Sequence, residues 1–517
     1  MSDQSDRPAA RRRRVLLTGL AVSFIAFAAF APAQDAPTPN QLRQIVREDP
    51  GNAHAWTDLG DALLAVSELE EAKAAYLEAI ALDYRLGDAH FGLGLAEYNR
   101  GDFQAALFSF SEVARQHPER FDGHFNRGVT LARLRMHAEA AESFRMAIEQ
   151  ARPEATLDDE FNANLGLAGQ LKLLGDFDGA AEAYEAASLI FPDDQDVRYL
   201  HAEALHGAGR GLDALPLLTE LDAESSDYRI SSLIADIYVE QGQNDYALRS
   251  LQRAIRNSEQ TGSATIQASL FVKLGLLQLQ LNQVQEALSS FERGTVVDPV
   301  SWEAHYNYGV TLLEQGRTET AVGPLETAVV LAPSSGEAKL ALATAYERAG
   351  RSGEAIGMAA GALEILEQPE LITQAEFVLG RAEYRTGEFE TAAFRLAGVV
   401  ADRPGDPQAQ LWAGLAAYQL GDYDEAALYY GRVVQLSPSS REGLVNLAAA
   451  YLAGGRYQDA EMIYSELLQA DPEDAASRYN LGWALLSQNR LTAARDAFEE
   501  ASRLGYGPAS EALTEYF

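Results

Sequence analysis

Residues 174–192 read LGDFDGAAEAYEAASLIFP, and residues 420–438 read LGDYDEAALYYGRVVQLSP. Both segments begin with leucine, glycine and aspartate and continue with an aromatic residue and a second aspartate. Two alanines, a tyrosine and a final proline follow in each of them. Two such similar segments, far apart in one chain, indicate a repeated structural unit whose period can be measured from the sequence.

The period of the repeat is 34 residues. Steps of 34 residues from Gly421 lead back to Gly387 and forward to Gly455, which open the related segments GEFETAAFRLAGVVADRP and GRYQDAEMIYSELLQADP. Further related segments begin at Gly350 and Gly316. When this glycine is placed at position 15 of a 34-residue unit, thirteen units cover residues 53–508, with short spacers between some of them.

The residue types at fixed positions predict two amphipathic helices in each unit. Position 8 is small, position 20 is alanine in all thirteen units, position 24 is usually aromatic, and position 32 is often proline. Positions 4, 7, 8 and 11 share one helix face, as do positions 20, 24 and 27. We expect the small residues to let the two helices approach closely, and the aromatic residue to fill the space where the next unit packs. A single unit cannot bury its own apolar face, so the units must stack.

These position classes resemble the tetratricopeptide repeat, and the resemblance covers about nine tenths of the chain after residue 33. It implies an all-α fold, an α-solenoid of stacked helix-turn-helix hairpins that forms a right-handed superhelix. Among the units that depart from the pattern at position 24 are those in which Leu218, Leu251 and Ala359 replace the aromatic residue. We expect the local packing to differ in those units and the fold to be the same.

The repeat pattern also predicts the domain organisation. The units form four groups, which span residues 53–154, 161–261, 268–369 and 373–508. The spacers 155–160, 262–267 and 370–372 predict longer helix ends or loops between these groups. We expect residues 34–52 to form a linker and an N-terminal capping helix, and residues 509–517 to form a C-terminal cap.

Residues 1–33 are typical of an export signal. Arg11 to Arg14 precede an apolar stretch from Val15 to Ala31, and a small-x-small site ends at Ala33. This order predicts a bacterial secretory signal peptide that is cleaved between Ala33 and Gln34. The alternative is an uncleaved membrane anchor, which needs about 20 apolar residues. In both cases we expect the rest of the chain in the periplasm or cell envelope, with an extracellular location left open, and membrane contact only through this segment.

The composition disfavours several classes of function. The 517 residues include 41 Lys and Arg against 76 Asp and Glu, and the resulting formal net charge of −35 argues against binding to nucleic acid. The chain has no cysteine, which excludes disulfides and thiolate metal ligands. It also lacks a phosphate-binding loop pattern, an H-E-x-x-H helix and a G-x-S-x-G elbow. We therefore predict no enzymatic activity and no cofactor.

Three histidines share position 4 of their units: His90, His124 and His305. His90 and His124 are one repeat apart, so their helices should be neighbours with axes about 10 Å apart. A bridging metal ion is one interpretation, and a histidine that substitutes for a bulky packing residue is the other. Because a metal site needs more than two ligands and no third is evident, we predict no metal site.

The resemblance implies that positions 2, 5, 9 and 12 of the first helices line a concave, peptide-binding groove. The residues carried over to these positions are Phe91, Leu95, Tyr98, Phe125, Val129, Tyr199, Tyr306, Phe377, Arg381, Tyr384, Leu411, Tyr418, Tyr479 and Trp483. Aromatic side chains on a rigid surface suit extended peptides or helices. The alternative is that several of these residues pack between helices.

These observations favour a non-enzymatic scaffold of the bacterial cell envelope that binds protein or peptide partners of unknown identity in its groove. An assembly factor for polysaccharide export, pili or secretion is a related hypothesis that rests on fold analogy alone. A superhelix that binds carbohydrate through aromatic side chains is a further alternative.

Overall fold

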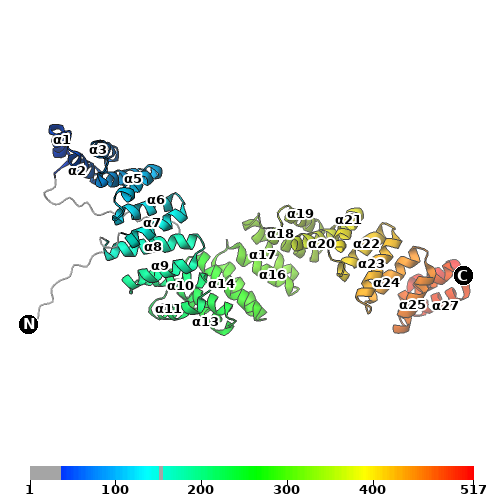
Figure 1. Cartoon of the computed structure of the whole chain (residues 1–517). Coiled ribbons are helices and arrows are strands. Elements are labelled where there is room, and N and C mark those ends of the chain that lie inside the picture. The colour runs from blue at the N-terminus through cyan, green and yellow to red at the C-terminus, as the bar shows by residue number, and fades with distance from the viewer. Residues whose placement is uncertain (1–36, 151–154) are drawn as a thin grey trace, which may run out of the picture. The chain divides into compact units, whose positions relative to one another are not determined.

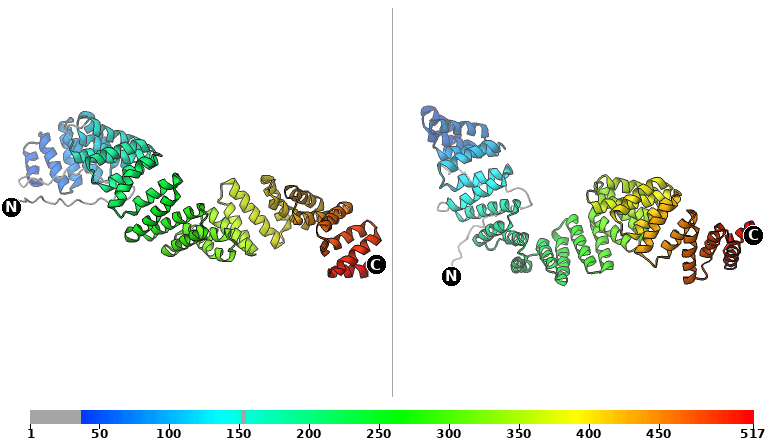
Figure 2. Two further views of the ribbon diagram at one scale, coloured as in Figure 1. Left: turned by 90° about the horizontal axis from the view of Figure 1, so that it is seen from below. Right: turned by 45° about the vertical axis from the view of Figure 1, so that its right-hand side comes forward.

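The computed structural model describes residues 37–150 and 155–517, and within these ranges the regular structure is entirely α-helical (Figure 1). The helices form two compact units, which divide between Asn257 and Ser258 inside α13 (Asn244–Thr261). In each unit, successive helices pack against one another along the chain (Figure 2). This arrangement confirms the predicted α-solenoid of helical hairpins.

The first compact unit begins with α1 (Pro39–Glu48), which packs on α2. Thr38 caps α1, because its side chain accepts a hydrogen bond from the backbone N–H of Gln41. The following helices are α2 (Ala53–Ala65), α3 (Leu69–Leu82), α4 (Gly87–Asn99), α5 (Phe103–Gln116), α6 (Phe121–Arg133), α7 (His137–Gln150), α8 (Leu157–Leu173), α9 (Phe177–Ile190), α10 (Gln195–Gly207), α11 (Gly211–Glu224), α12 (Tyr228–Glu240) and α13.

The second compact unit contains seven further hairpins and ends with a short helix, α28 (Gly507–Tyr516), which packs on α27. Its hairpins consist of α14 (Ala264–Gln280), α15 (Val284–Val297), α16 (Trp302–Glu314), α17 (Thr318–Leu331), α18 (Gly336–Arg348), α19 (Ser352–Leu363), α20 (Pro369–Thr386), α21 (Phe389–Asp402), α22 (Pro407–Gln419), α23 (Tyr423–Leu436), α24 (Arg441–Ala453), α25 (Tyr457–Ala470), α26 (Ala475–Ser487) and α27 (Leu491–Arg503). First helices of neighbouring hairpins also contact each other directly; for example, α18 contacts both α16 and α20.

Three first helices are longer than the others. Most first helices contain 13 residues, whereas α8 and α14 contain 17 and α20 contains 18. Each of the three begins four residues before position 1 of its unit, so most of each spacer is helical and adds about one turn. Thr156 starts α8 with a capping box and Ser263 caps α14, which satisfies backbone N–H groups at the new helix ends.

Position 15 of the unit adopts the left-handed backbone conformation in all thirteen hairpins. Nine of these residues are glycines, for which a positive φ carries little cost. The other four are Ser67, Arg135, Asn282 and Asn489, with φ between 59° and 62°. The turn between the two helices therefore requires this conformation even where no glycine supplies it.

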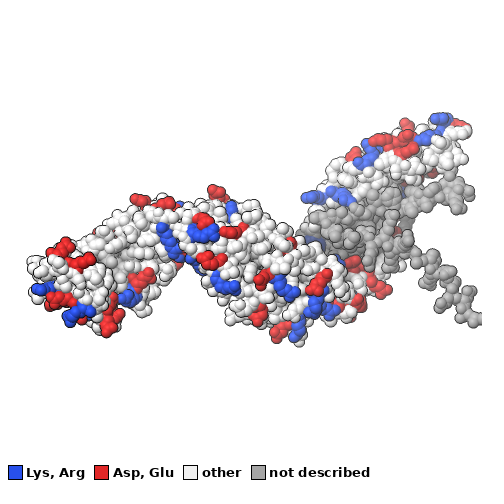
Figure 3. Space-filling model, turned by 180° about the vertical axis from the view of Figure 1, so that it is seen from behind, with Lys and Arg blue, Asp and Glu red and all other residues white. Residues whose placement is uncertain are grey.

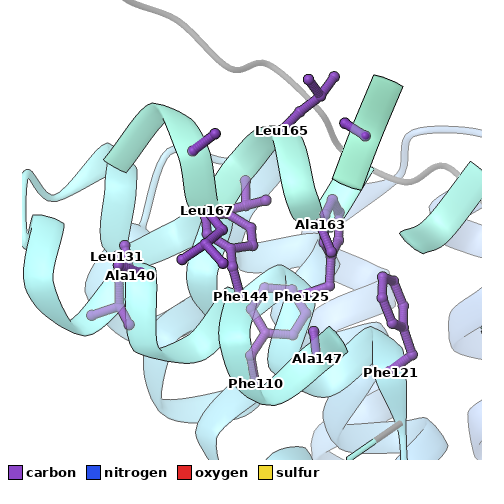
Figure 4. Packing of buried hydrophobic residues seen from close by; sticks show 14 of the residues in the cluster. Phe110, Phe121, Phe125, Leu131, Ala140, Phe144, Ala147, Ala163, Leu165 and Leu167 are labelled. Atoms are coloured by element: carbon purple, nitrogen blue, oxygen red, sulfur yellow. The ribbon is translucent and has the colours of Figure 1, made fainter. Parts of the chain in front are cut away.

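The residues at positions 8, 20 and 24 form the core of each hairpin. All thirteen alanines at position 20 are fully buried, and the side chains at position 24 are at most 5 % exposed. A Cβ added to Gly275 at position 8 would lie 2.5 Å from the ring of Phe291, so only a small residue fits opposite the ring. A Cβ on Gly166 of the next unit would lie 2.8 Å from the ring of Phe144. The position-24 side chain therefore lies between its own first helix and the next one (Figure 4).

The five units without an aromatic residue at position 24 are also closely packed. Their position-24 side chains are between 0 % and 2 % exposed; these are Leu218, Leu251, Leu325, Ala359 and Leu396. In three of these units position 8 is a fully buried alanine, namely Ala202, Ala235 and Ala343. In the other two it is glycine, and a Cβ on Gly309 would lie 2.5 Å from Leu325, and one on Gly380 2.9 Å from Leu396. Leucine at position 24 therefore fills the space beside the first helix as the aromatic residues do in the other units.

The predicted export signal, including Ala33 and Gln34, lies outside the described residues, as do residues 151–154 at the end of the third unit. Among the described helices, none is long and apolar enough to cross a membrane.

Candidate functional site

The first helices of three successive units in the second compact unit surround a hollow of about 440 Å³. Its lining comes from α16, α18 and α20, and most of it occupies positions 2, 5, 9, 12 and 13 of the repeat. The residues are Tyr306, Val310, Leu313, Glu314, Glu337, Leu340, Ala341, Thr344, Arg348, Leu371 and Gln374. The hollow therefore lies on the helix face that the tetratricopeptide resemblance assigns to the groove.

The hollow combines apolar side chains with charges of both signs. Leu313 and Leu340 are buried, and Tyr306 is partly buried. The pKa of Tyr306 is raised by burial and by the nearby carboxylates of Glu337 and Glu314, so its hydroxyl stays protonated at neutral pH. Arg348 donates a hydrogen bond of 3.1 Å to the backbone carbonyl of Leu313. An apolar side chain with polar groups beside it would fit this composition.

A cluster of arginines lies next to the hollow, where α18, α20 and α22 meet. Glu347 on α18 is 1 % exposed and forms ion pairs with Arg381 (2.8 Å) and Arg385 (2.5 Å) on α20. Arg385 also donates a hydrogen bond of 2.6 Å to the backbone carbonyl of Glu347. Burial lowers the pKa of Arg381, with Glu347 opposing this shift and the positive charges of Arg385 and Arg348 adding to it. Two guanidinium groups thus share one buried carboxylate, with Arg348 nearby.

Trp412 on α22 completes this cluster. The guanidinium carbons of Arg381 and Arg385 lie 4.9 Å and 5.5 Å from the centre of a Trp412 ring. Tyr384 contacts Trp412 edge to face, with ring centroids 5.5 Å apart, and Arg381 also lies 5.4 Å from the centre of the Phe377 ring. Stacking between guanidinium groups and aromatic rings fixes the arginine side chains and leaves their N–H edges available for acceptors.

The structure brings together four of the predicted groove residues in this region: Tyr306, Phe377, Arg381 and Tyr384. Five others are less than 10 % exposed and pack between helices, so they offer a partner little surface; these are Leu95, Tyr98, Phe125, Val129 and Leu411. The remaining five are partly exposed on their helices, namely Phe91, Tyr199, Tyr418, Tyr479 and Trp483. Whether any of the fourteen contacts a partner remains a prediction.

Several polar residues of the site were missed by the sequence reasoning. Glu347, Glu337 and Thr344 occupy positions 12, 2 and 9, which the resemblance assigns to the groove, but the choice of mainly aromatic residues left them out. Arg385 and Trp412 occupy positions 13 and 6, which lie outside those four positions. A pattern rule could have found the first three residues, whereas the last two required the packing of α20 against α22.

The histidines at position 4 have a structural partner. The Nε2 atoms of His90, His124 and His305 lie 2.9, 3.0 and 3.2 Å from the backbone carbonyl oxygen of the residue six positions earlier. Trp56 and Gln410 donate the same hydrogen bond with lengths of 3.0 and 3.1 Å. The side chain at position 4 therefore ties the start of the first helix to the preceding loop. Within the described residues, no group of three or more metal-ligating side chains is arranged to hold a metal ion.

The comparisons with known proteins agree with this geometry. The tetratricopeptide repeat family model matches seven segments, of which the first three overlap, at residues 40–83, 57–114, 91–155, 174–229, 272–336, 377–441 and 445–507. This chain belongs to the tetratricopeptide repeat family. One curated relative is anaphase-promoting complex subunit 3 of Schizosaccharomyces pombe, which is 27% identical over 160 residues, or 31% of this chain and 23% of that protein. The chain thus matches less than a quarter of that relative's length.

Several solved structures of repeat proteins are similar to parts of this chain. The Cut9–Hcn1 hetero-tetramer of the APC/C matches with 13% identity and a TM-score of 0.34, over 86% of this chain and 98% of that chain. YrrB, described as a tetratricopeptide repeat protein with an unusual peptide-binding site, matches with 21% identity and a TM-score of 0.33, over 37% of this chain and 96% of that chain. A tetratricopeptide repeat protein from Parabacteroides merdae matches with 18% identity and a TM-score of 0.36, over 50% of this chain and 100% of that chain.

Proposed function

We propose that this tetratricopeptide repeat protein is a non-enzymatic scaffold of the bacterial cell envelope. In this proposal it binds a protein partner on the first-helix surface of α16, α18, α20 and α22. The observation that carries the proposal is the position of the hollow directly beside the Glu347–Arg381–Arg385–Trp412 cluster. Family membership supports protein–protein interaction as the general role.

The chemistry of this surface suits a partner segment with an apolar residue and an acidic residue. The apolar residue would enter the hollow, where Leu313, Leu340 and Tyr306 provide apolar contacts. A carboxylate would bind at Arg381 and Arg385, because two cations share only Glu347 there and their ring contacts already hold them in place. Two guanidinium groups against one carboxylate give this cluster a local excess of positive charge, which favours an acidic partner residue there.

A substitution that fills the hollow tests this proposal. Thr344 lines the hollow, and its hydroxyl donates to the carbonyl of Leu340 at 2.8 Å. Thr327 on α17 donates in the same way to the carbonyl of Gly323 at 3.0 Å, away from the hollow, and provides a matched control. We expect Thr344→Trp to abolish recovery of a protein partner from envelope extract, and Thr327→Trp to leave it unchanged. Equal recovery with both variants, or recovery of carbohydrate alone, would overturn the proposal.

The location in the envelope is supported by the basic, apolar and small-residue order of residues 11–33. Mass spectrometry of the protein purified from fractionated cells tests it. We expect a mature chain that begins at Gln34 and is found with the envelope fraction. A chain that begins at Met1 or Ser2 contradicts cleavage, and its presence in the cytoplasmic fraction contradicts export. Hydrolase or transferase activity in the purified protein would contradict the non-enzymatic role.

A further inference from the structure

Three large apolar side chains form an exposed row on the second helices of consecutive hairpins. Phe394 on α21, Leu428 on α23 and Met462 on α25 all occupy position 22 of their units and are 87%, 75% and 64% exposed. They belong to the same compact unit, and equivalent positions of stacked hairpins point the same way. We call these three residues the outer row. Single exposed apolar residues are ordinary, whereas three at the same position of consecutive hairpins form a regular row that one partner can contact.

Two glycines leave open space beside members of the outer row. Gly398 and Gly431 lie about one helical turn after Phe394 and Leu428, and an added Cβ at either glycine would meet no atom within 4 Å. These glycines therefore have no packing reason inside the hairpin and leave open space beside the apolar side chains. A partner backbone could approach α21 and α23 closely at these points.

Acidic side chains flank the outer row. Glu390 and Asp424 lie four residues before Phe394 and Leu428, Glu466 lies four residues after Met462, and all three are exposed. Residues four apart share a helix face, so these carboxylates lie beside the apolar side chains. On the same face, Arg432 follows Leu428 by four residues and donates to Gln435 at 3.0 Å. Among the residues four positions from the outer row on its own helices, three therefore carry carboxylates and one carries a guanidinium. Arg456, which precedes α25, also interacts with Asp424. One view of the charge distribution is given in Figure 3.

We propose that the outer row binds one amphipathic α-helix of a partner protein, with lysine or arginine beside its apolar stripe. The second helices α21, α23 and α25 pack on the first helices between them, α22 and α24, and not closely on one another. Their axes are therefore farther apart than the roughly 10 Å of two packed helices. A helix rises 1.5 Å per residue, so apolar residues more than two turns apart on a crossing helix meet consecutive members of the row. Basic residues beside that stripe pair with Glu390, Asp424 and Glu466.

Charge distinguishes this occupant from two others. A second copy of this chain would bring its own acidic flanks and a net charge of −35 against the same surface, which like-charge repulsion disfavours. An anionic membrane surface would be repelled by the same carboxylates. A basic amphipathic helix satisfies both the apolar and the acidic parts of the surface. This surface is separate from the hollow on the first helices, so its occupant is independent of the proposed function.

A synthetic peptide binding experiment on the full chain tests the proposal. The probe is a fluorescently labelled amphipathic helix of about 21 residues, or roughly 30 Å, with leucine at heptad a and d positions and lysine beside them. A second peptide has glutamate in place of lysine, and a third has the lysine composition in scrambled order. The third peptide is needed because any basic peptide is attracted to a chain of net charge −35.

The variant Phe394→Glu/Leu428→Glu/Met462→Glu removes the outer row without touching the core, since all three side chains are exposed. The control variant is Val296→Glu/Val330→Glu, which adds charge at residues of α15 and α17 that are 73% and 77% exposed. We expect the lysine peptide to bind the parent and the control at least 10-fold more tightly than it binds the triple variant. We also expect it to bind the parent at least 10-fold more tightly than the glutamate and scrambled peptides do.

Three results would overturn the proposal. Equal binding of the lysine peptide to the parent and the triple variant would show that the outer row is not the site. Equal binding of the scrambled peptide would show attraction by charge alone. Sedimentation that shows a dimer for the parent and a monomer for the triple variant would identify a second copy as the occupant.

Discussion

Replacement of Phe291 by alanine tests the packing on which every hairpin depends. Phe291 is fully buried at position 24 of its unit, and its ring lies where a Cβ on Gly275 would have to be. Burial of a phenylalanine removes about 150–250 Å² from water. At about 25 cal/mol per Å² this corresponds to about 4–6 kcal/mol. Because alanine keeps part of this burial and a cavity remains, we expect Phe291→Ala to lower the free energy of unfolding by about 3–5 kcal/mol.

The measurement must be local, because stacked repeats unfold as neighbouring units and not as one block. Amide hydrogen exchange in α14 and α15 should accelerate strongly in Phe291→Ala, whereas exchange in α26 and α27 should change little. The matched control is Phe394→Ala, since Phe394 is 87% exposed and its removal should change stability by less than about 0.5 kcal/mol. A loss below about 1 kcal/mol in Phe291→Ala, or equal losses in the two variants, would refute the packing argument.

Substitutions at four other residues have expected outcomes that urea denaturation can measure. Arg135→Gly should raise the free energy of unfolding by about 1 kcal/mol, because Arg135 has φ of +60°, and Gly421→Ala at φ +82° should lower it by a similar amount. A decrease for Arg135→Gly or an increase for Gly421→Ala would contradict the requirement for a left-handed turn. Burial raises the pKa of Asp61 to about 6, and the hydrogen bond from Tyr76 opposes this shift. Between about pH 4 and 6 the folded state therefore binds more protons than the unfolded state, so the protein loses stability as the pH rises through this range. Asp61→Asn should therefore stabilise the protein at pH 7.5 by about 1–3 kcal/mol and have little effect at pH 4, and a pH-independent effect would exclude this cause. Glu347→Ala should destabilise the protein by about 2–4 kcal/mol, because it leaves the two arginine partners without their carboxylate. Glu347→Gln should have an intermediate effect. An unchanged free energy of unfolding in Glu347→Ala would show that the ion pairs do not stabilise the protein.

The fold could be read from the sequence because its stabilising contacts repeat. Alanine at position 20 and the residue pair at positions 8 and 24 make the same packing contacts in all thirteen units. The comparison of these units within one chain therefore shows which positions are buried, which usually requires an alignment of related sequences. The left-handed turn was predictable from glycine at position 15 in nine units. It was not predictable from Arg135 alone, since that residue adopts the conformation only because the stacked helices on both sides require it.

The candidate site could be predicted only in part, because its residues do not repeat. Tyr306, Phe377 and Arg381 lie at positions that a family rule marks as groove. Trp412 became part of the site through its contact with Arg381 across two helices, and no spacing within one unit encodes that contact. The hydrogen bond from position 4 to the carbonyl six residues earlier was hidden for a related reason. Tryptophan, histidine and glutamine all make it, so the residue type varies while the donor is preserved.

The repeat architecture therefore separates the residues that build the protein from those that give it a specific partner. A periodic position such as position 20 is occupied by the same residue in every hairpin, and it cannot distinguish one hairpin from another as a binding site. Specificity must come from the residues that break the period, such as the buried Glu347 with its arginines on the first helices and Phe394 with the outer row on the second helices. Both departures fall within α16–α25 of the second compact unit. If binding instead depended on the periodic positions, substitutions at equivalent sites in any hairpin would weaken it equally.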